Sequence, residues 1–278
     1  MVDALTPGLY IVAGPIGNLS DLSPRAADIL CRADVVAVED SRVSAKLLRH
    51  AGSDRPMVPY HDHSDEAVRA RLVGRMAHEA VALLSDAGTP LISDPGYKLV
   101  RDARAAGHAI TTIPGPCAAI AGLTLSALPT DRFLFMGFLP AKSKARGDVL
   151  AEVKDIRATL VFYESGPRLS ASLNDMALGL GDREAAVCRE ISKSFEEVKA
   201  GHLLELAAAC QDHPPKGEIV VVVGPPGEKE KPSEEDADGL LREALTRLSV
   251  GKAASEVAKA TGLDRRSLYA RALDLKGE

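Results

Sequence analysis

The chain has 278 residues, of which 46% are apolar and 26% charged, with a formal net charge of −5. This balance is typical of a packed globular protein of two domains, and it excludes a polycationic nucleic-acid coat while allowing a local basic patch. There is no apolar run long enough for a membrane span and no basic segment followed by an apolar one at the start, so we expect a cytoplasmic protein without membrane contact.

Short apolar runs alternate with helical stretches along the first 224 residues. The apolar runs are rich in β-branched residues, which is typical of strands covered on both faces by helices. The expected strands are 9–13, 34–38, 81–84, 110–113, 133–138, 159–163, 185–189 and 218–223. The expected helices are 23–33, 64–79, 167–180 and 203–210. This alternation predicts an α/β fold with a mainly parallel sheet.

Turn chemistry and composition divide the chain. The turn 113–116, which contains Pro-Gly-Pro, predicts a boundary between α/β domains at 1–116 and 117–224. A linker rich in Pro, Gly and charge follows at 225–236. In the tail, 237–278, apolar stripes interrupted by Gly262 predict a helix-turn-helix-like segment. The last 30 residues hold six cations and four anions, a net +2, which fits either nucleic-acid contact or a solvated packing module.

Two loops follow expected strands and carry residues suited to a ligand. Residues 14–19, GPIGNL, lack the spacing of a dinucleotide-binding loop and fit either a tight turn or a ligand loop. Residues 85–96, SDAGTPLISDPG, combine small residues with Asp86 and Asp94. Because ligands bind outside the carboxyl ends of parallel strands, this loop is a candidate site, with a capped structural turn as the alternative.

Other clusters are less specific. The small residues at 114–122 open a helix and would leave a shallow wall, or else allow close helix–sheet packing. Charged residues at 162–165 and 189–197 fit either a cleft or exposed caps. Three cations in residues 142–146 form a candidate phosphate loop or an ordinary charged loop. The triplet His61-Asp62-His63 lacks a nearby third ligand, and no cysteines form a CxxC pair, so we expect no metal.

The sequence resembles the tetrapyrrole-methylase superfamily in segments that run in order along nearly the whole chain: GLYIVAGPIGNLSDLSPRA, AVEDSR, SDAGTPLISDPG, IPGPCAAIAGL, FLFMGFLP, FYESGPRL, CREISKSFEE and GEIVVVVG. Within it, the chain is similar to the enzymes that methylate the 2′-hydroxyl of a cytidine in the decoding centre of 16S ribosomal RNA. The resemblance implies two α/β domains with a ligand cleft between them, a small helical tail, S-adenosylmethionine as methyl donor, a homodimer and no metal. Its partner would be 16S RNA or the small ribosomal subunit.

The resemblance also places the methyl-donor site. Carried over by motif, that site comprises Asp86, Ala87, Gly88, Thr89, Ile92, Ala118, Ala119, Tyr163 and Glu164. Two positions depart from the usual pattern. Gly166-Pro167 stands where relatives carry Pro-His, which puts any role of that His in doubt, and Ser41 stands where many carry Thr.

Methyl transfer to a hydroxyl needs an aligned oxygen, carbon and sulfur, and a base can assist by removing the hydroxyl proton. The candidates for base are Asp40 and Glu39, with Arg42 and Lys193 holding phosphate or steering charge. Five cationic residues are expected to bind RNA, on the basis of their charge alone: Lys142, Lys144, Arg146, Arg265 and Arg266.

Two other functions remain open on the sequence. A methylase of the same fold could act on a tetrapyrrole or on a protein. A non-catalytic RNA-binding module would use the tail and would not bind S-adenosylmethionine.

Overall fold

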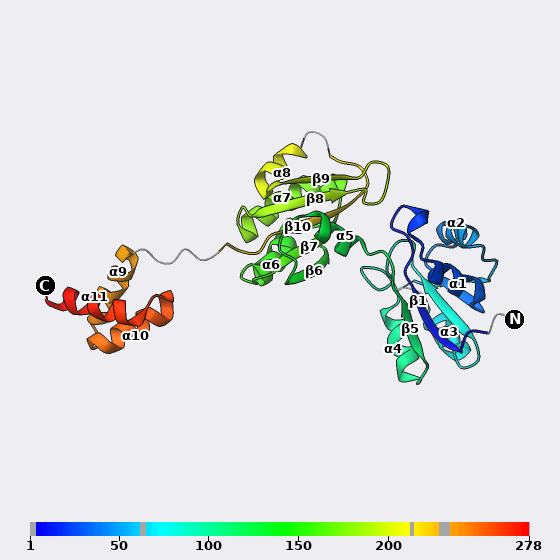
Figure 1. The fold of residues 1–278 in the computed structure, drawn as a ribbon, viewed down its shortest axis with the longest axis horizontal. Coiled ribbons are helices and arrows are strands. Elements are labelled where there is room, and N and C mark those ends of the chain that lie inside the picture. Colours follow the sequence, from blue (N-terminus) through cyan, green and yellow to red (C-terminus); the bar gives the residue numbers. More distant parts are fainter. Residues whose placement is uncertain (1–3, 62–64, 212–213, 228–233, 278) are drawn as a thin grey trace. The chain divides into compact units, whose positions relative to one another are not determined.

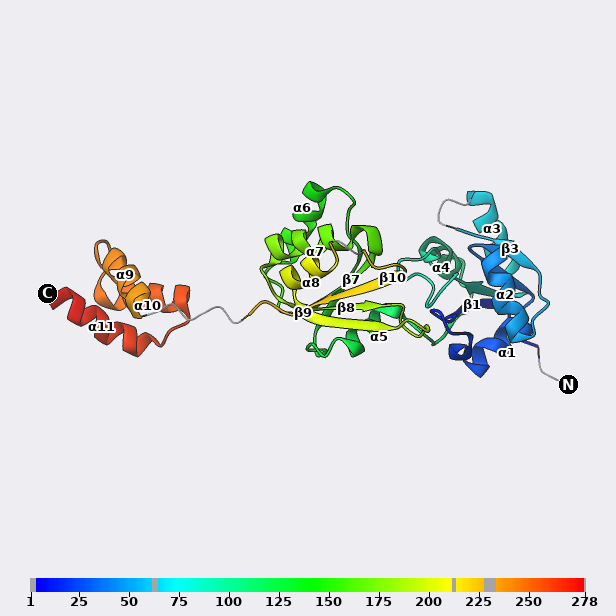
Figure 2. The ribbon, with the colours of Figure 1, turned by 90° about the horizontal axis from the view of Figure 1, so that it is seen from above.

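A computed structural model describes residues 4–61, 65–211, 214–227 and 234–277. The chain forms two compact units, Met1–Pro226 and Gly227–Glu278. The larger unit contains two five-stranded sheets, which Figures 1 and 2 show together with their covering helices. Among the described residues, no helix combines the length and apolarity needed to cross a membrane.

The first sheet is parallel throughout and has the order β3-β2-β4-β1-β5. Its strands are β1 Gly8–Val12, β2 Val35–Val38, β3 Met57–Pro59, β4 Ala80–Leu84 and β5 Ile110–Ile113. Its helices are α1 Pro24–Arg32, α2 Ser41–Ala51, α3 Glu66–Arg75 and α4 Tyr97–Ala105, with the short 3-10 helix η1 Leu19–Asp21 after β1. One core cluster joins α1 and α2 to the sheet and another joins α3 and α4, so both faces are covered.

The strand register brings three loops together. Val12 of β1 pairs with Leu84 of β4 and with Ile113 of β5, so these strands end level with one another. The segments that follow them therefore start side by side at the carboxyl edge of the sheet, which is where open α/β sheets bind ligands.

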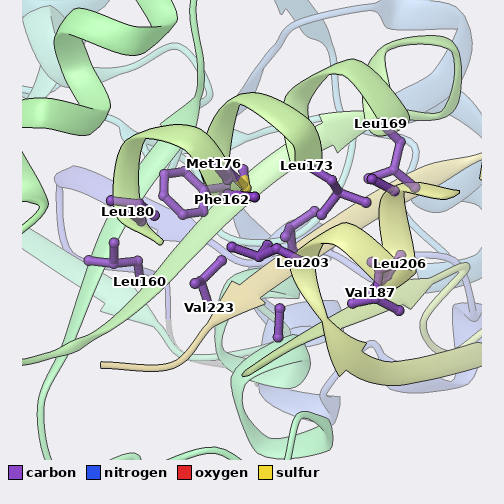
Figure 3. Close-up of a cluster of buried hydrophobic side chains, with 14 of the residues drawn as sticks. Leu160, Phe162, Leu169, Leu173, Met176, Leu180, Val187, Leu203, Leu206 and Val223 are labelled. Atoms are coloured by element: carbon purple, nitrogen blue, oxygen red, sulfur yellow. The ribbon is translucent and has the colours of Figure 1, made fainter. Parts of the chain in front are cut away.

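The second sheet has the order β6-β7-β10-β8-β9, and only β6 and β7 are parallel. Its strands are β6 Phe133–Phe138, β7 Thr159–Ser165, β8 Glu184–Arg189, β9 Glu197–His202 and β10 Glu218–Val223. Its helices are α5 Ala118–Leu125, α6 Ser143–Val153, α7 Gly166–Leu180 and α8 Leu203–Ala209. Figure 3 shows the core that α7 and α8 build against one face, and α5 covers the other face.

The α/β class and the eight expected strands are confirmed, whereas the expectation of a mainly parallel sheet is wrong for the second sheet. The connection between β8 and β9 has only seven residues, from Glu190 to Glu196. A parallel crossover needs about a dozen residues or more, so this connection forces an antiparallel hairpin.

The smaller unit consists of α9 Glu234–Leu245, α10 Val250–Thr261 and α11 Arg265–Gly277, visible in Figure 1. Gly262 ends α10 with a φ of 72°, a left-handed conformation that glycine adopts without steric cost. Buried Ala and Leu side chains of all three helices form a core of their own. The unit is thus a helical segment, with a Gly262 turn between α10 and α11.

Candidate functional site

A cavity of about 300 Å³ lies in the larger unit. Its walls come from the loops after β1 and β4, the start of α5, the ends of β6 and β7, the loop after β8 and the start of β10. The volume is at the lower end of the usual range for small-molecule sites. The lining residues are Ile16, Ala87, Gly88, Thr89, Ile92, Ser93, Asp94, Cys117, Ala118, Phe138, Tyr163, Glu164, Ser165, Glu190, Ile191, Lys193, Gly217, Glu218, Ile219 and Val220.

Backbone bonds hold the loop after β4 in place. The Gly14 N–H donates to the Gly88 carbonyl at 2.8 Å, and the Gly88 N–H donates to the Pro15 carbonyl at 3.2 Å. The Thr89 hydroxyl donates to the Pro116 carbonyl at 2.9 Å. Gly88 has a φ of 72°, and a Cβ there would lie 3.2 Å from Cγ2 of Ile16. The loops after β1, β4 and β5 therefore form one rigid floor.

Two non-glycine residues in this loop have positive φ angles, Leu91 at 74° and Ser93 at 62°. Each such residue costs of the order of 1–3 kcal/mol and persists only where the surrounding structure imposes it. The two strained residues flank Ile92, and Ser93 directly precedes Asp94. Ile92, Ser93 and Asp94 line the cavity, whereas Leu91 does not.

Asp86 and Asp94, the two carboxylates of this loop, have different surroundings. Asp86 accepts a hydrogen bond from the Asp40 backbone N–H at 3.1 Å and adjoins the wall without lining it. Asp94 lines the cavity, and burial raises its pKa to about 6. Repulsion from Glu39, Asp86 and Glu218 adds to this shift, and a hydrogen bond from Ser85 opposes it.

Aromatic rings form part of the opposite wall. The Ala119 backbone N–H donates to the Tyr163 hydroxyl oxygen at 3.1 Å, which joins α5 to β7. The ring of Tyr163 packs edge-on against Phe135 and Phe138, with centroids 5.0 and 5.5 Å away. Burial raises the pKa of Tyr163, so this hydroxyl stays protonated. Phe138 lines the cavity with more than half of its surface exposed.

Glu164 is buried, and its carboxylate is fully engaged. It accepts from the Ser165 backbone N–H at 2.8 Å and from the Ser172 hydroxyl at 2.5 Å, and it pairs with Arg168 at 3.2 Å. These bonds fix the end of β7 to the start of α7.

We call the part of the larger unit built on the first sheet the first lobe, and the part built on the second sheet the second lobe. Lys193 belongs to the second lobe and reaches the first. Its Nζ donates to Glu190 at 3.1 Å and to Glu218 at 3.0 Å. Burial lowers its pKa, but these carboxylates more than compensate and raise it above the ordinary value, so the amine stays charged. Its aliphatic chain packs where a Cβ of Gly17 would lie, 2.4 Å from Cγ. Nearby, the Ser192 hydroxyl bonds the Asp21 carboxylate of η1. Lys193 is thus a cation that joins the two lobes.

The other nominated catalytic residues, Glu39, Asp40 and Arg42, lie outside the residues that line the cavity. Asp40 caps α2 and accepts from Arg42 through the backbone N–H at 2.8 Å and through Nη2 at 2.7 Å. These bonds lower the pKa of Asp40 to about 2, which makes it a weak base near neutral pH. Glu39 is half-buried and acts on Asp94 through its charge.

The expected phosphate loop is mostly helix, because Lys142 precedes α6 as its N-cap and Lys144 lies in its first turn. Both lysines are exposed. Arg146 is 4% exposed, pairs with Asp175 at 2.5 Å and donates to the carbonyls of Pro140 and Ala141. The expectation that Arg146 binds RNA is therefore corrected, because its guanidinium is buried and already bonded to Asp175 and to two backbone carbonyls.

In the smaller unit, Arg265 and Arg266 are exposed in the first turn of α11. Of the histidine triplet, His61 is exposed, while Asp62 and His63 lie outside the described residues. Within the described ranges, no group of three or more His, Cys, Asp or Glu side chains could hold a metal ion.

The cavity also contains residues that the sequence did not nominate. Ser93 and Asp94 belong to the loop 85–96 that the sequence predicts as a candidate site, but neither is among the methyl-donor residues carried over by the resemblance. The segment from Gly217 to Val220 is at the amino end of β10, which lies beside the carboxyl ends of β7 and β8 because the strands are antiparallel. A parallel sheet would have placed it at the far edge.

Comparison with known proteins identifies the family. Residues 8–207 match the family described as Tetrapyrrole (Corrin/Porphyrin) Methylases. The chain belongs to the tetrapyrrole methylase family. Residues 231–276 match a second family, described as the RsmI C-terminal HTH domain.

Relatives of this tetrapyrrole methylase match it over nearly its whole length. A protein of Erythrobacter litoralis named ribosomal RNA small subunit methyltransferase I is 56% identical over 274 residues, which cover 99% of this chain and 97% of the relative. A protein of the same name from Mesorhizobium japonicum is 48% identical, with 98% and 93% covered.

Solved structures share the tetrapyrrole methylase fold. Uroporphyrin-III C-methyl transferase from Thermus thermophilus, complexed with S-adenyl homocysteine, is 22% identical with a TM-score of 0.54, covering 78% of this chain and 97% of that one. A conserved hypothetical protein from Aeropyrum pernix K1 is 20% identical with a TM-score of 0.61, covering 97% and 96%. At these identities the likeness concerns the fold.

Proposed function

We propose that the protein transfers a methyl group from S-adenosylmethionine to small-subunit ribosomal RNA, at the 2′-hydroxyl of a cytidine in the decoding centre. The observation that carries the proposal is the cavity walled by the loop after β4, the start of α5 and the end of β7. It occurs in a chain that is similar over 99% of its length to a curated ribosomal RNA small subunit methyltransferase.

The cavity suits the methyl donor. Ala87, Gly88 and Ala118 keep the part of the wall that they form free of long side chains, and a Cβ at Gly88 would meet Ile16. Ile92 and Val220 give apolar surface beside the polar groups of the loop. This mixture of apolar walls and few polar groups is what small-molecule sites present.

Seven residues of the cavity wall would hold the donor: Ala87, Gly88, Thr89, Ile92, Ala118, Tyr163 and Glu164. Asp86 and Ala119 lie immediately behind this wall and would support it. When bound, S-adenosylmethionine supplies a methyl group on a sulfonium centre. The protein contributes orientation. Thr89 and Tyr163 fix the loop and α5 through hydrogen bonds, so the walls are set before the substrate arrives.

Charge limits where RNA binds. The chain as a whole carries a net negative charge, so exposed cationic side chains would make the contacts to RNA phosphate. These are Lys142, Lys144, Arg265 and Arg266. Phosphate contacts release counterions, and affinity for RNA should therefore fall steeply with salt. We further propose a cytoplasmic homodimer.

The test is methyl incorporation from labelled S-adenosylmethionine into purified small ribosomal subunits. A porphyrinogen precursor and a protein mixture serve as competing acceptors, and the modified nucleotide is mapped. We expect incorporation into the RNA alone. Incorporation into either competing acceptor would replace the proposed substrate.

Calorimetry tests the cofactor. We expect wild type to bind S-adenosylmethionine and Asp86→Ala to bind it at least tenfold more weakly with its fold intact, because Asp86 organises the loop beside the cavity. A wild-type protein without measurable binding would contradict the enzymatic function and leave an RNA-binding module.

A further inference from the structure

The carboxylates of the cavity are not equivalent. Four acidic residues line it, namely Asp94, Glu164, Glu190 and Glu218. Glu164 is held by two serines and Arg168, and the other two glutamates share Lys193. Among the residues that the structure describes, no lysine or arginine forms an ion pair with Asp94. Asp94 is therefore the lining carboxylate whose charge is not matched by a cation.

The backbone presents Asp94 at some cost. Ser93, directly before it, has a φ of 62°, in the left-handed region that residues with a side chain rarely adopt. A Cβ at Gly137 of β6 would lie 3.1 Å from the Ser93 hydroxyl, so the loop reaches the second lobe at this point. Strain imposed on a residue beside a cavity is typical of a functional position.

The groups that face Asp94 are mostly acidic or neutral. Glu39 follows β2, Asp86 belongs to the same loop and Glu218 begins β10, and all three repel its negative charge. The Ser85 side chain opposes the rise in the pKa of Asp94, and Tyr163 across the cavity is neutral because burial raises its pKa. Lys193 lines the same cavity but is engaged by two glutamates. Burial and repulsion together raise the pKa of Asp94 to about 6, near the value at which a general base is most effective at neutral pH.

We propose that Asp94 is the general base of the methyl transfer and accepts the proton of the attacking RNA hydroxyl. The inference rests on the proposed function. The hydroxyl oxygen gains a bond to the methyl carbon, the leaving sulfur keeps the electron pair of the broken carbon–sulfur bond, and the proton passes to the Asp94 carboxylate and then to water. Asp94 replaces Asp40 in this role, because Asp40 is tied to Arg42 and does not line the cavity.

The experiment compares wild type with Asp94→Asn, Asp94→Glu and the matched control Asp28→Asn. Asp28 is an exposed carboxylate on α1 whose charge pairs with Arg32. Single-turnover methylation of purified small subunits is followed from pH 5 to 9. Affinities for S-adenosylmethionine and for the subunit are measured separately, by calorimetry and filter binding.

We expect Asp94→Asn to lower the single-turnover rate about 10²- to 10⁴-fold, the usual contribution of a general base. Both affinities should stay within about threefold of wild type, since an amide keeps the shape of the side chain. In wild type and in Asp94→Glu the rate should rise with pH and then level off, whereas Asp94→Asn should lose that limb. Asp28→Asn should behave as wild type.

Two results would overturn the inference while wild type remains active on RNA. One is a rate for Asp94→Asn within about threefold of wild type. The other is loss of S-adenosylmethionine affinity in that variant, which would make Asp94 an anchor for the cationic donor. A wild-type protein that methylates no RNA would instead overturn the proposed function, and the proton transfer with it.

Discussion

At the scale of single residues, the surroundings of Asp94 affect stability as well as chemistry. The pKa of this carboxyl is 3.8 in an unfolded chain and about 6 in the folded one. The folded state therefore favours the protonated form of this carboxyl. Its contribution to the free energy of unfolding is fully present below pH 4 and is lost as the pH rises to 6. Above pH 6 the charge destabilises the fold by roughly 1–2 kcal/mol after allowance for solvent screening.

The variant Asp94→Asn should consequently be more stable than wild type at pH 8 and equally stable at pH 4. Urea unfolding at both pH values measures the difference, and Asp28→Asn serves again as the carboxylate-to-amide control. A variant that loses stability at pH 8 would show that the carboxylate makes favourable contacts which outweigh its burial.

Arg146 and Lys144 are two residues apart in α6 and should respond differently to substitution. Arg146→Ala leaves Asp175 half-buried without its cation, and we expect a loss of about 2–4 kcal/mol in the free energy of unfolding. Lys144→Ala should leave stability unchanged and weaken RNA binding by up to tenfold. Denaturant unfolding and filter binding separate the two effects. Unchanged stability of Arg146→Ala together with weakened RNA binding would restore Arg146 as an RNA contact.

At the scale of elements, the sequence predicts what burial dictates. Strands such as β4 and β10 are apolar on both faces, because helices cover both sides of their sheets, and their bounds were predicted to within a residue. The edge strand β9 was missed because most of its residues are exposed and its polar and non-polar residues do not form an apolar run, and β3 was missed because it has three residues and ends at Pro59. Short apolar runs reveal central strands and not edges.

The site was predictable to the same extent. The loop after β4 was found from its composition and its place at a strand end. The choice among its carboxylates depends on the positive φ angles at Leu91 and Ser93, which no residue pattern indicates in non-glycine residues. Similarly, the position of Lys193 depends on an antiparallel hairpin that brings it over Gly17.

The packing of α5 on the second sheet is a tight contact that can be tested. A Cβ at Gly122 would lie 2.6 Å from Cγ1 of Val220, which is buried and lines the cavity. Gly122→Ala should therefore push α5 away from the sheet and destabilise the protein by about 1–3 kcal/mol. Because α5 begins at Ala118 in the cavity wall, S-adenosylmethionine affinity should fall too.

Gly147 in α6 is the matched control, because a Cβ there would meet nothing within 4 Å. Gly147→Ala should stabilise the protein by roughly 0.5–1 kcal/mol through helix propensity, with unchanged affinity for the methyl donor. Thermal unfolding and calorimetry measure both quantities. Equal behaviour of the two alanine variants would mean that α5 has room to shift without affecting the site.

At the scale of the whole molecule, the cavity and the helical tail belong to separate compact units. Every residue that lines the cavity belongs to Met1–Pro226, whereas the helical unit has a hydrophobic core of its own. Arg265 and Arg266 open a helix whose buried side is Leu268 and Ala272, so their charges are not needed for packing. This separation predicts that the tail contributes to RNA affinity and not to the methyl-transfer step.

Truncation after Pro226 should therefore leave S-adenosylmethionine affinity and the rate at saturating subunit unchanged, while KM for the subunit rises about tenfold or more. Each lost phosphate contact lowers the slope of log affinity against log salt by about one unit, so the truncated chain should bind RNA with a shallower salt dependence. The full-length double variant Arg265→Ala and Arg266→Ala should reproduce about two units of that change. Steady-state kinetics and filter binding between 50 and 300 mM salt measure both effects. If the truncated chain kept the KM and the salt slope of the full chain, the helical unit would not bind RNA, and the acceptor would be held by the larger unit alone.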